Sequence, residues 1–393
     1  MISVKEAKAI IRNNVQPLAP VMIPIAQAGG CTLAEDVYAA TDIPAFNQSS
    51  MDGYAFRFSD WSAGSELIIA GEIPAGTAPT ASLPAKRAMR IFTGAAVPQG
   101  ADTVVMQEKV VVANNTLQLQ DEQLKPGNNV RAKGSEIKTG SQALTKNSFL
   151  SPAAIGFLAG IGLNELPVYP IPSVCIIVTG KELQQPGESL QYGQVYESNS
   201  FALRTALRQL QINDITVVWA DDDLIILKNI LEQALQQHDV VLLTGGVSVG
   251  DYDFVLEAAG LCGVTRLFHK IKQRPGKPLF FGKKDNKVVF GLPGNPSSVL
   301  TCFYEYVLPA LDQMTIQHNS LKVVHVPLAK DYKKLPGLAH FLKGYYDGSK
   351  AEPLNAQESY RLHSFARANC LICLEEERED YKEGEVVEVH LLS

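Results

Sequence analysis

Apolar and polar residues follow one another in different patterns along this chain, and the clearest pattern lies in its middle. Short apolar runs occupy residues 174–178, 215–219 and 240–243, and segments of helical periodicity occupy about 198–211, 223–237 and 252–260. Unbroken apolar runs of this length suit parallel strands that are buried on both faces. The alternation of strand and helix therefore predicts a parallel sheet with right-handed crossover helices.

The flanking parts of the chain show shorter, strand-like patterns. Residues 65–125 carry short strands separated by Gly and Pro, and the segments 322–328, 370–374 and 386–391 alternate or run apolar in the same way. Such patterns predict small all-β modules. An amphipathic helix is expected at residues 4–11, and a second helix is expected to open with Ser151 as its cap and Pro152 at its first position.

Clusters of proline and glycine mark the boundaries between these parts. We expect an extended N-terminal domain (1–44 with 131–170), an inserted β domain (45–130), an α/β domain (171–318) and a C-terminal β domain (319–393). The predicted fold class is multidomain α/β plus β. A central three-layer α/β domain is flanked by β modules, the last of them resembling a β-barrel.

Composition narrows the class of protein. The 393 residues are 46% hydrophobic and 19% charged, which favours several packed domains over a disordered chain. The net charge of −6 argues against a nucleic-acid-binding surface. No apolar run reaches the roughly 18 residues of a membrane span and no targeting segment is visible, so a cytoplasmic protein is expected. The six cysteines are scattered, and Cys370 and Cys373 lie in a strand-like run rather than a metal knuckle.

Glycine and acidic residues follow each of the three predicted strands. They are Thr179-Gly180-Lys181-Glu182, Asp221-Asp222-Asp223, and Thr244-Gly245-Gly246 with Ser248, Gly250, Asp251 and Asp253 beyond it. Ligands of open α/β sheets bind beyond the carboxyl ends of the strands. Glycines let backbone N–H groups approach an anion, and the aspartates offer oxygen ligands to a divalent cation. The glycine pair alone is also typical of a plain strand-to-helix turn with an Asp cap.

Two later segments add positive charge and free N–H groups. Lys270, Arg274 and Lys277 concentrate cations in an acidic chain, and beside the strand ends they suggest a clamp for an oxyanion, although alone they fit a solvated loop. Gly291-Leu292-Pro293-Gly294-Asn295-Pro296-Ser297-Ser298 then leads into an apolar helix. The N–H groups of its first turn are expected to face the ligand.

The inserted β domain contributes two polar loops. Asp52 sits in the turn Met51-Asp52-Gly53-Tyr54-Ala55, which can present a single carboxylate. Thr93 heads a loop of small residues, and its hydroxyl is expected to reach an anion. Taken alone, each is an ordinary loop.

Together these motifs resemble those of the MoeA/gephyrin E-domain family. The matching segments are Met51-Asp52-Gly53-Tyr54-Ala55, Thr93-Gly94-Ala95 with Gly100-Ala101-Asp102, Thr244 to Gly250, Pro275-Gly276-Lys277-Pro278 and Gly291 to Pro296. Several spaced motifs in one order are far more specific than any single glycine loop. The resemblance covers almost the whole chain and is weakest after residue 318.

The resemblance implies a molybdopterin molybdenumtransferase with a MogA-like, molybdopterin-binding central domain. Such an enzyme inserts molybdenum from molybdate into adenylylated molybdopterin and releases AMP with the help of Mg²⁺. It implies a homodimer whose extended N-terminal domains associate, with the active site between the α/β domain of one subunit and the module carrying Asp52 and Thr93 of the other. A molybdopterin adenylyltransferase and molybdoenzyme-maturation proteins are the expected partners. Neither binding to nucleic acid nor binding to a membrane is expected.

The same resemblance assigns roles to residues. The catalytic group is Asp52, Thr93, Glu182, Asp221 and Asp253. Molybdopterin and the nucleotide are bound by Gly180, Gly245, Gly246, Ser248, Gly250, Pro293, Gly294, Asn295 and Pro296. The oxyanion of molybdate or phosphate is held by Lys270, Arg274, Lys277 and Ser297, and the metal by Asp221, Asp251 and Asp253.

The chain departs from the family pattern at several positions. Lys181 stands where the family usually has Asp, Gly134-Ser135-Glu136-Ile137 replaces Gly-Glu-Asp-Ile, and Arg274 replaces a lysine. Residues 359–364 lack the usual glycine-rich approach, which predicts that the last domain makes no molybdate contact. Two alternatives therefore stand beside the enzyme: a molybdopterin-binding scaffold or regulatory protein that Lys181 favours, and a molybdopterin adenylyltransferase, which the extra flanking modules oppose.

Overall fold

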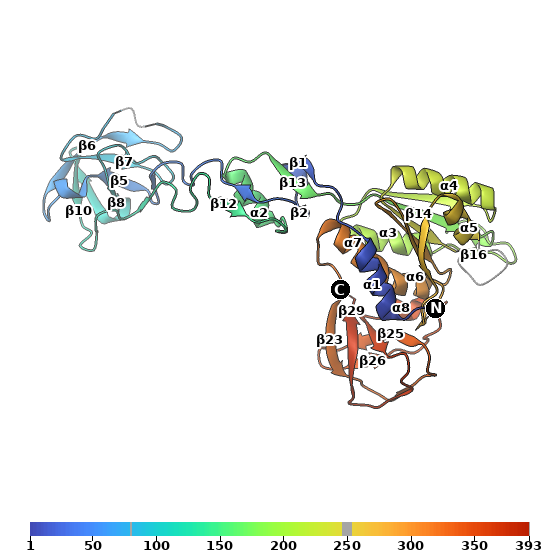
Figure 1. The fold of residues 1–393 in the computed structure, drawn as a ribbon. Coiled ribbons are helices and arrows are strands. Elements are labelled where there is room, and N and C mark those ends of the chain that lie inside the picture. Colours follow the sequence, from blue (N-terminus) through green and yellow to red (C-terminus); the bar gives the residue numbers. More distant parts are fainter. Residues whose placement is uncertain (79–80, 246–253, 393) are drawn as a thin grey trace. The chain divides into compact units, whose positions relative to one another are not determined.

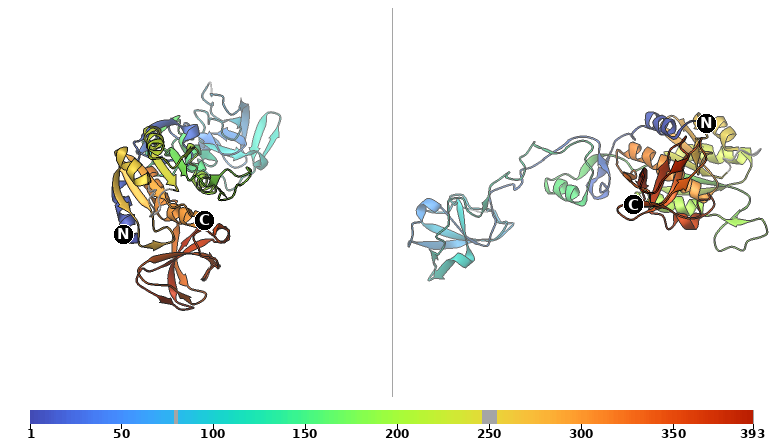
Figure 2. Two further views of the ribbon diagram at one scale, coloured as in Figure 1. Left: turned by 90° about the vertical axis from the view of Figure 1, so that its right-hand side faces the viewer. Right: turned by 90° about the horizontal axis from the view of Figure 1, so that it is seen from below.

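The computed structural model describes residues 1–78, 81–245 and 254–392. The chain forms two compact units, each drawn in Figures 1 and 2. The first unit comprises Met1–Val21, Gly30–Thr32 and Tyr169–Ser393, and the second comprises Met22–Gly29 and Leu33–Val168. No helix among the described residues combines the length and the apolar character needed to cross a membrane.

The core of the first unit is a six-stranded sheet in the order β17-β14-β18-β22-β21-β19. Its strands are β14 (Val174–Thr179), β17 (Ile215–Ala220), β18 (Val240–Thr244), β19 (Thr265–His269), β21 (Phe280–Lys284) and β22 (Lys287–Leu292). The strands predicted from the three apolar runs are confirmed, and they pair in parallel with each other and with β22. The prediction of a parallel sheet does not hold for the whole sheet, because β21 and β19 pair antiparallel at one edge.

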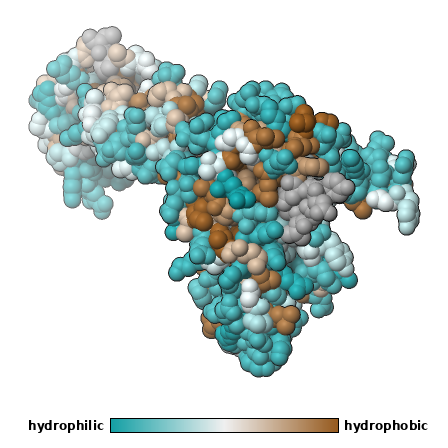
Figure 3. Space-filling view, turned by 45° about the vertical axis from the view of Figure 1, so that its right-hand side comes forward, coloured by the Kyte–Doolittle hydropathy of each residue, from teal (hydrophilic) through white to brown (hydrophobic). Residues whose placement is uncertain are grey.

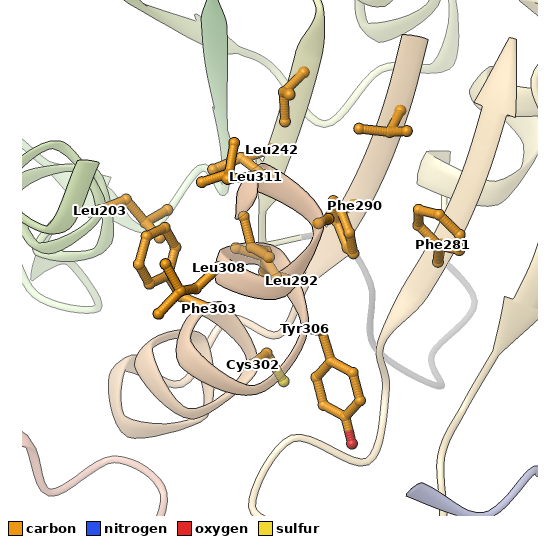
Figure 4. Close-up of a cluster of buried hydrophobic side chains, with 14 of the residues drawn as sticks. Leu203, Leu242, Phe281, Phe290, Leu292, Cys302, Phe303, Tyr306, Leu308 and Leu311 are labelled. Carbon is orange, nitrogen blue, oxygen red and sulfur yellow. The ribbon is translucent and has the colours of Figure 1, made fainter. Parts of the chain in front are cut away.

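Helices cover both faces of this sheet. They are α1 (Val4–Asn14), α3 (Asn199–Gln209), α4 (Leu224–Gln237), α5 (Phe254–Leu261), α6 (Pro296–Cys302) and α7 (Leu308–Thr315), with the π-helical turn η4 (Phe303–Val307) between the last two. Apolar residues of α1, α3, α6, η4 and α7 pack on one face, and those of α4 and α5 pack on the other. Figure 4 shows the first of these clusters, in which side chains from helices and strands point toward one another. The predicted three-layer arrangement is therefore confirmed.

The last part of the first unit is a β module. Its sheet has the order β20-β25-β27-β29-β23, and β26 (Ala351–Pro353) pairs with β25. The strands are β20 (Gln273–Arg274), β23 (Lys322–Pro327), β25 (Ala339–Tyr346), β27 (Cys370–Leu374) and β29 (Val386–Leu391), and the short helix α8 spans Leu362–Phe365. Cys370 and Cys373 lie in β27, as predicted. Since β20 comes from the segment between β19 and β21, this sheet is continuous with the central part of the unit.

The second unit contains the other predicted β module. A six-stranded sheet has the order β8-β5-β7-β6-β10-β9, with β5 (Gly53–Phe56), β6 (Glu66–Ile73), β7 (Arg87–Ile91), β8 (Thr103–Met106), β9 (Val110–Ala113) and β10 (Thr116–Leu119). Shorter sheets join β1 (Val21–Pro24), β13 (Glu165–Tyr169) and β2 (Thr32–Leu33), β11 (Val130–Arg131) and β4 (Gln48–Ser49), and β12 (Gln142–Leu144) and β3 (Val37–Tyr38). Helix α2 (Pro152–Gly160) begins after Ser151, whose side chain accepts from the N–H of Ala154, so the predicted cap is confirmed.

Most of the surface on the face shown in Figure 3 is hydrophilic, and hydrophobic side chains form smaller patches on it. Such a distribution is ordinary for a protein of several packed modules, because there is too little polar surface to cover them entirely.

Candidate functional site

A cleft of about 960 Å³ lies in the first unit, beyond the carboxyl ends of the parallel strands. It contains eight of the residues that the sequence assigned to ligand binding or catalysis: Glu182, Gly245, Arg274, Lys277, Pro293, Gly294, Asn295 and Pro296. Its other lining residues come from 195–199, from the turn 275–278 and from the C-terminal module at 338 and 357–360. The cleft therefore brings together segments that are more than 150 residues apart in the sequence.

Two glycines shape the turns beside β14 and β18. Gly245 has φ +88°, and a Cβ there would lie 2.2 Å from the backbone oxygen of Thr179. Gly180 has φ +136°, and a Cβ there would lie 2.9 Å from Oε1 of Glu182. Glycine is required at position 245 because the end of β14 lies too close for a side chain, and at position 180 because of its positive φ. The Glu182 carboxylate can therefore fold back over the end of β14 at the wall of the cleft.

Asn199 joins two of the turns, and the sequence analysis missed it. Its Nδ2 donates to Oγ1 of Thr244 at 2.9 Å and to the backbone oxygen of Gly294 at 2.8 Å. Because the backbone oxygen of Gly294 can only accept, the orientation of the amide is fixed. A signal was present in the sequence: Asn199 begins a helix directly after the short strand β16 (Val195–Tyr196), at the position where α/β proteins bind ligands.

The positive charges of the cleft lie on a turn that is fixed from below. Arg274 and Lys277 are exposed, and among the described residues neither forms an ion pair with a carboxylate. Beneath them, Gln273 is fully buried and its Nε2 donates to the backbone oxygens of Pro275 at 3.0 Å and Gly276 at 3.2 Å. The hydroxyl of Tyr306 donates in turn to Oε1 of Gln273. Two unpaired cations on a rigid support suit a tetrahedral oxyanion.

Lys270 is not among the residues that line this cleft. It has φ +72°, and its backbone N–H and C=O bond to Leu279 and Ile2. The role predicted for Lys270 in holding the oxyanion therefore stays a prediction.

The assignment of Ser297 to the oxyanion site is corrected by the structure. The residue is fully buried, its Oγ donates to the backbone oxygen of Arg361 at 3.0 Å, and its N–H donates to the backbone oxygen of Ser359. Both donors are thus occupied by the C-terminal module. Ser297 instead ties the start of α6 to that module.

The C-terminal module contributes to the wall of the cleft, whereas the expectation that it makes no molybdate contact stays a prediction. Residues 357–360 line the cleft, and Nδ2 of Asn295 donates to Oγ of Ser359 at 2.9 Å. Lys343 holds this segment from inside: it is 2% exposed, and its Nζ donates to the backbone oxygens of Ala356 at 2.8 Å, Arg361 at 3.0 Å and Glu358 at 3.2 Å. Burial lowers the pKa of Lys343 to about 8. A buried ammonium group thus organises one wall of the cleft.

The predicted metal ligands are only partly described. Asp221 is exposed after β17 and is not a lining residue of the cleft. Its neighbours serve local structure: Asp223 caps α4 by accepting from the N–H groups of Ile225 and Ile226, and Asp222 accepts from the N–H of Lys181. Asp251 and Asp253 lie outside the described residues, as do Gly246, Ser248 and Gly250.

One group of described side chains does meet the distances of a metal site, but it lies elsewhere. Glu305, Cys373 and His390 place potential ligand atoms within 4.8 Å of one another. However, Glu305 already accepts from Nζ of Lys8 at 2.6 Å and pairs with Nδ1 of His390 at 2.6 Å. Despite its burial, the hydrogen bond with His390 lowers the pKa of Glu305. We interpret this group as a buried ion network that joins α1, η4 and β29.

In the second unit, Asp52 and Thr93 meet directly. Oδ1 of Asp52 accepts from both the N–H and the hydroxyl of Thr93, each at 2.7 Å. These bonds, that from the N–H above all, lower the pKa of Asp52. The hydroxyl of Thr93 thus donates to an anion, but this anion is the carboxylate of Asp52, and a contact with a substrate anion stays a prediction. Thr93 therefore orients Asp52, and among the described residues no hydrogen bond or ion pair reaches Oδ2 of Asp52.

Close packing against β8 explains why a glycine, Gly53, follows Asp52. A Cβ at Gly53 would lie 1.9 Å from the backbone oxygen of Val105 on the neighbouring strand β8. Since no side chain fits there, only glycine lets β5 begin directly after Asp52. The motif thus has a packing reason as well as a chemical one.

The chain matches three family models. The MoeA N-terminal region (domains I and II) matches residues 2–162, a probable molybdopterin-binding domain matches residues 175–313, and the MoeA C-terminal region (domain IV) matches residues 325–392. Together these matches extend over nearly the whole chain.

Relatives and solved structures match over the same length. A molybdopterin molybdenumtransferase of Haemophilus influenzae is 34% identical over 407 residues and covers 100% of both chains. One of Staphylococcus aureus is 32% identical over 400 residues, which is 99% of this chain and 95% of the relative. The structure of a molybdopterin biosynthesis MoeA protein from Pyrococcus horikoshii superposes with a TM-score of 0.84 at 30% identity, covering 100% of this chain and 99% of that one. On the strength of these full-length matches and of the cleft described above, the chain belongs to the MoeA family.

Proposed function

We propose that this protein inserts molybdenum from molybdate into adenylylated molybdopterin and releases AMP. The observation that carries the proposal is the cleft, which Arg274 and Lys277 line together with the glycine turn at Gly245 and Glu182, and in which neither cation pairs with a carboxylate among the described residues. Molybdate and phosphate are both tetrahedral oxyanions, and the planar guanidinium group of Arg and the compact ammonium group of Lys bind such anions. The relatives of similar length are named for this transfer.

The reaction asks for positioning and charge stabilisation rather than for a protein nucleophile. Arg274 and Lys277 hold the oxyanion, while the amide of Asn199 donates to Thr244 and Gly294 and so fixes the turns that receive the nucleotide and the pterin. Glu182 supplies a carboxylate at the same wall. Ser359, which Asn295 contacts, closes the cleft from the C-terminal module.

Mg²⁺ fits the donor set as far as the structure describes it. Asp221 offers an exposed carboxylate after β17, and oxygen ligands are those that Mg²⁺ prefers. We propose that Asp221 holds the ion together with Asp251 and Asp253, which lie outside the described residues. When bound, Mg²⁺ would neutralise the charge that develops on the phosphates.

A second copy of the chain is the expected partner, and helix α2 supports this proposal. Every residue of α2 is apolar or glycine, yet only Leu158 is buried, and the adjoining Phe149 is 56% exposed. A helix that is apolar on all sides is normally covered. We propose that α2 of a second subunit covers it, and that Asp52 and Thr93 of one subunit then serve the cleft of the other.

The setting of the reaction follows from its substrates. We place the protein in the cytoplasm, after a molybdopterin adenylyltransferase that supplies the pterin nucleotide and before the proteins that mature molybdoenzymes. Each of these partners would share the pterin with this chain.

The test is a reaction with purified protein, adenylylated molybdopterin, molybdate and Mg²⁺, in which AMP is measured by chromatography. We expect AMP release that depends on molybdate and is lost in Asp52→Ala, with the melting temperature unchanged. Tight nucleotide binding without AMP release would instead indicate the scaffold that Lys181 favours. Formation of the pterin nucleotide from ATP and molybdopterin would indicate an adenylyltransferase.

A further inference from the structure

Arg90 stands out in the second unit because its guanidinium group is held from several sides. It lies on β7 directly across from Tyr54 on β5. Its Cζ is 5.4 Å from the ring centroid of Tyr54 and 5.4 Å from that of Phe92. Its Nη1 donates to the hydroxyl of Tyr54 at 3.1 Å, and its Nη2 donates to Oε1 of Gln107 at 2.9 Å. The side chain is therefore fixed before any ligand arrives.

The positive charge of Arg90 is nevertheless not neutralised by contact. Among the described residues, no carboxylate forms an ion pair with it. An arginine has five N–H donors. Two bonds are made to neutral side chains, so donors remain, and the side chain is only half-buried. An ordered arginine with spare donors and no counter-ion is suited to bind an anion at little cost in conformational entropy.

Its position places this charge beside Asp52. Arg90 bonds to Tyr54, two residues after Asp52, and its guanidinium group lies over the ring of Phe92. Phe92 directly precedes Thr93, whose N–H and hydroxyl both bond to Asp52. The electrostatic effect of Arg90 is one of the causes that lower the pKa of Asp52, after the hydrogen bonds from Thr93. The loop with Asp52 and Thr93 thus has a cation beside it, although Thr93 itself directs its hydroxyl proton to Asp52.

We propose that Arg90 binds a tetrahedral oxyanion group of the substrates, either a phosphate of the pterin nucleotide or molybdate, next to the carboxylate of Asp52. The proposal rests on the proposed function for the identity of the substrates but not for the existence of the anion site. In this site, Arg90 binds the anion, and its hydrogen bonds to Tyr54 and Gln107 orient the guanidinium group. The carboxylate of Asp52 binds the cation or proton that accompanies the anion.

The experiment measures equilibrium binding to the full-length protein by calorimetry, with AMP and with molybdate as separate probes. The variants are Arg90→Met, which keeps the length and packing of the side chain but removes its charge, and Arg90→Lys, which keeps the charge but not the forked donors. Arg87→Met is the matched control, since Arg87 is an exposed arginine on the same strand.

We expect Arg90→Met to weaken the binding of one probe about tenfold or more, because charge-assisted hydrogen bonds are lost. Arg90→Lys should lose less, and Arg87→Met should bind as the wild type does. An effect on AMP alone identifies the phosphate, and an effect on molybdate alone identifies molybdate. If AMP is released in the transfer assay, the KM for the same substrate should rise while the KM for the other does not.

The proposal is overturned if Arg90→Met binds both probes with wild-type affinity at an unchanged melting temperature, or if Arg87→Met weakens binding as much. Should Arg90→Met lower the melting temperature, Arg90→Gln replaces it, because an amide can still bond to Tyr54 and Gln107 without carrying charge. Binding is measured without turnover, so a protein that releases no AMP refutes the proposed function and leaves the Arg90 test intact.

Discussion

Gly276→Ala is expected to destabilise the first unit and to weaken its anion site together. Gly276 lies between Arg274 and Lys277 in the turn that carries the positive charge of the cleft. It has φ +86°, and a Cβ there would lie 2.6 Å from Sγ of the buried Cys302 and 2.9 Å from Nε2 of Gln273. A methyl group therefore has no room unless the turn moves away from its support.

The size of the effect follows from two contributions. A residue with a side chain in the left-handed region costs about 1–2 kcal/mol. Overpacking against a filled interior adds about 1–3 kcal/mol, since Cys302 is fully buried and Gln273 is already bonded to the turn. The free energy of unfolding of the first unit should fall by about 2–5 kcal/mol, and the KM for molybdate or the pterin nucleotide should rise as the two cations are displaced.

The assay is denaturant unfolding followed by tryptophan fluorescence. Trp219 lies in β17 of the first unit and Trp61 lies in the second unit, so a Trp61→Phe background reports on the first unit alone. The control is Gly187→Ala, because Gly187 also has a positive φ, +100°, but nothing lies within 4 Å of its Cβ position. The free energy of unfolding of Gly187→Ala should fall only by the cost of placing a residue with a side chain in the left-handed backbone region.

A second variant isolates the clash itself. In a Cys302→Ala background the sulfur that the new methyl group meets is absent, so Gly276→Ala should cost less than it does in the wild-type background, although Nε2 of Gln273 still lies 2.9 Å from the Cβ position. The reasoning is refuted if Gly276→Ala costs no more than Gly187→Ala in the wild-type background, or if removing the sulfur of Cys302 recovers none of the loss.

Three further outcomes are expected. Thr93→Val should lower the rate of AMP release by about tenfold or more, since the hydroxyl that orients Asp52 is lost, while Thr93→Ser should keep most of it; equal rates would exclude this role. Lys343→Met should speed hydrogen exchange at residues 356–361, whose buried carbonyl oxygens lose their donor, and unchanged exchange would show that the loop does not depend on the lysine. Burial alone would lower the pKa of His390, but the hydrogen bond with Glu305 outweighs it and raises that pKa, so the charged imidazole stabilises the fold fully below pH 6.5 and less as the pH rises through the raised pKa. The melting temperatures of the wild type and of His390→Gln should therefore converge above neutral pH, and a difference that stays constant with pH would contradict the assignment.

Local patterns in the sequence determined much of the central fold. The buried strands β14, β17 and β18 follow from their apolar runs, and the helix that begins after Ser151 follows from its cap and its proline. These features depend on residues close together in the chain, where periodicity and capping chemistry act. The antiparallel edge strands β19 and β21 were missed because their residues are mixed in polarity and pair only with each other and β22.

The residue types of the site were also visible in the sequence, but their partners were not. Glycine turns, carboxylates and cations pointed to an oxyanion site, and Arg274 and Lys277 do meet Gly245 at one cleft. Ser297 looked equally suitable until the structure showed its hydroxyl bonded to Arg361, 64 residues away in the sequence.

Only the tertiary structure decided which polar groups are free and which are already satisfied. Residues 357–360 line the cleft and are held there by the buried Lys343, Lys270 is not among the lining residues, and the hydroxyl of Thr93 donates a hydrogen bond to Asp52. The sequence lists donors, acceptors and charges, and it sets the local geometry that carries them. Whether a group can serve a ligand depends on burial and on hydrogen bonds between distant segments, and those arise only when the chain packs.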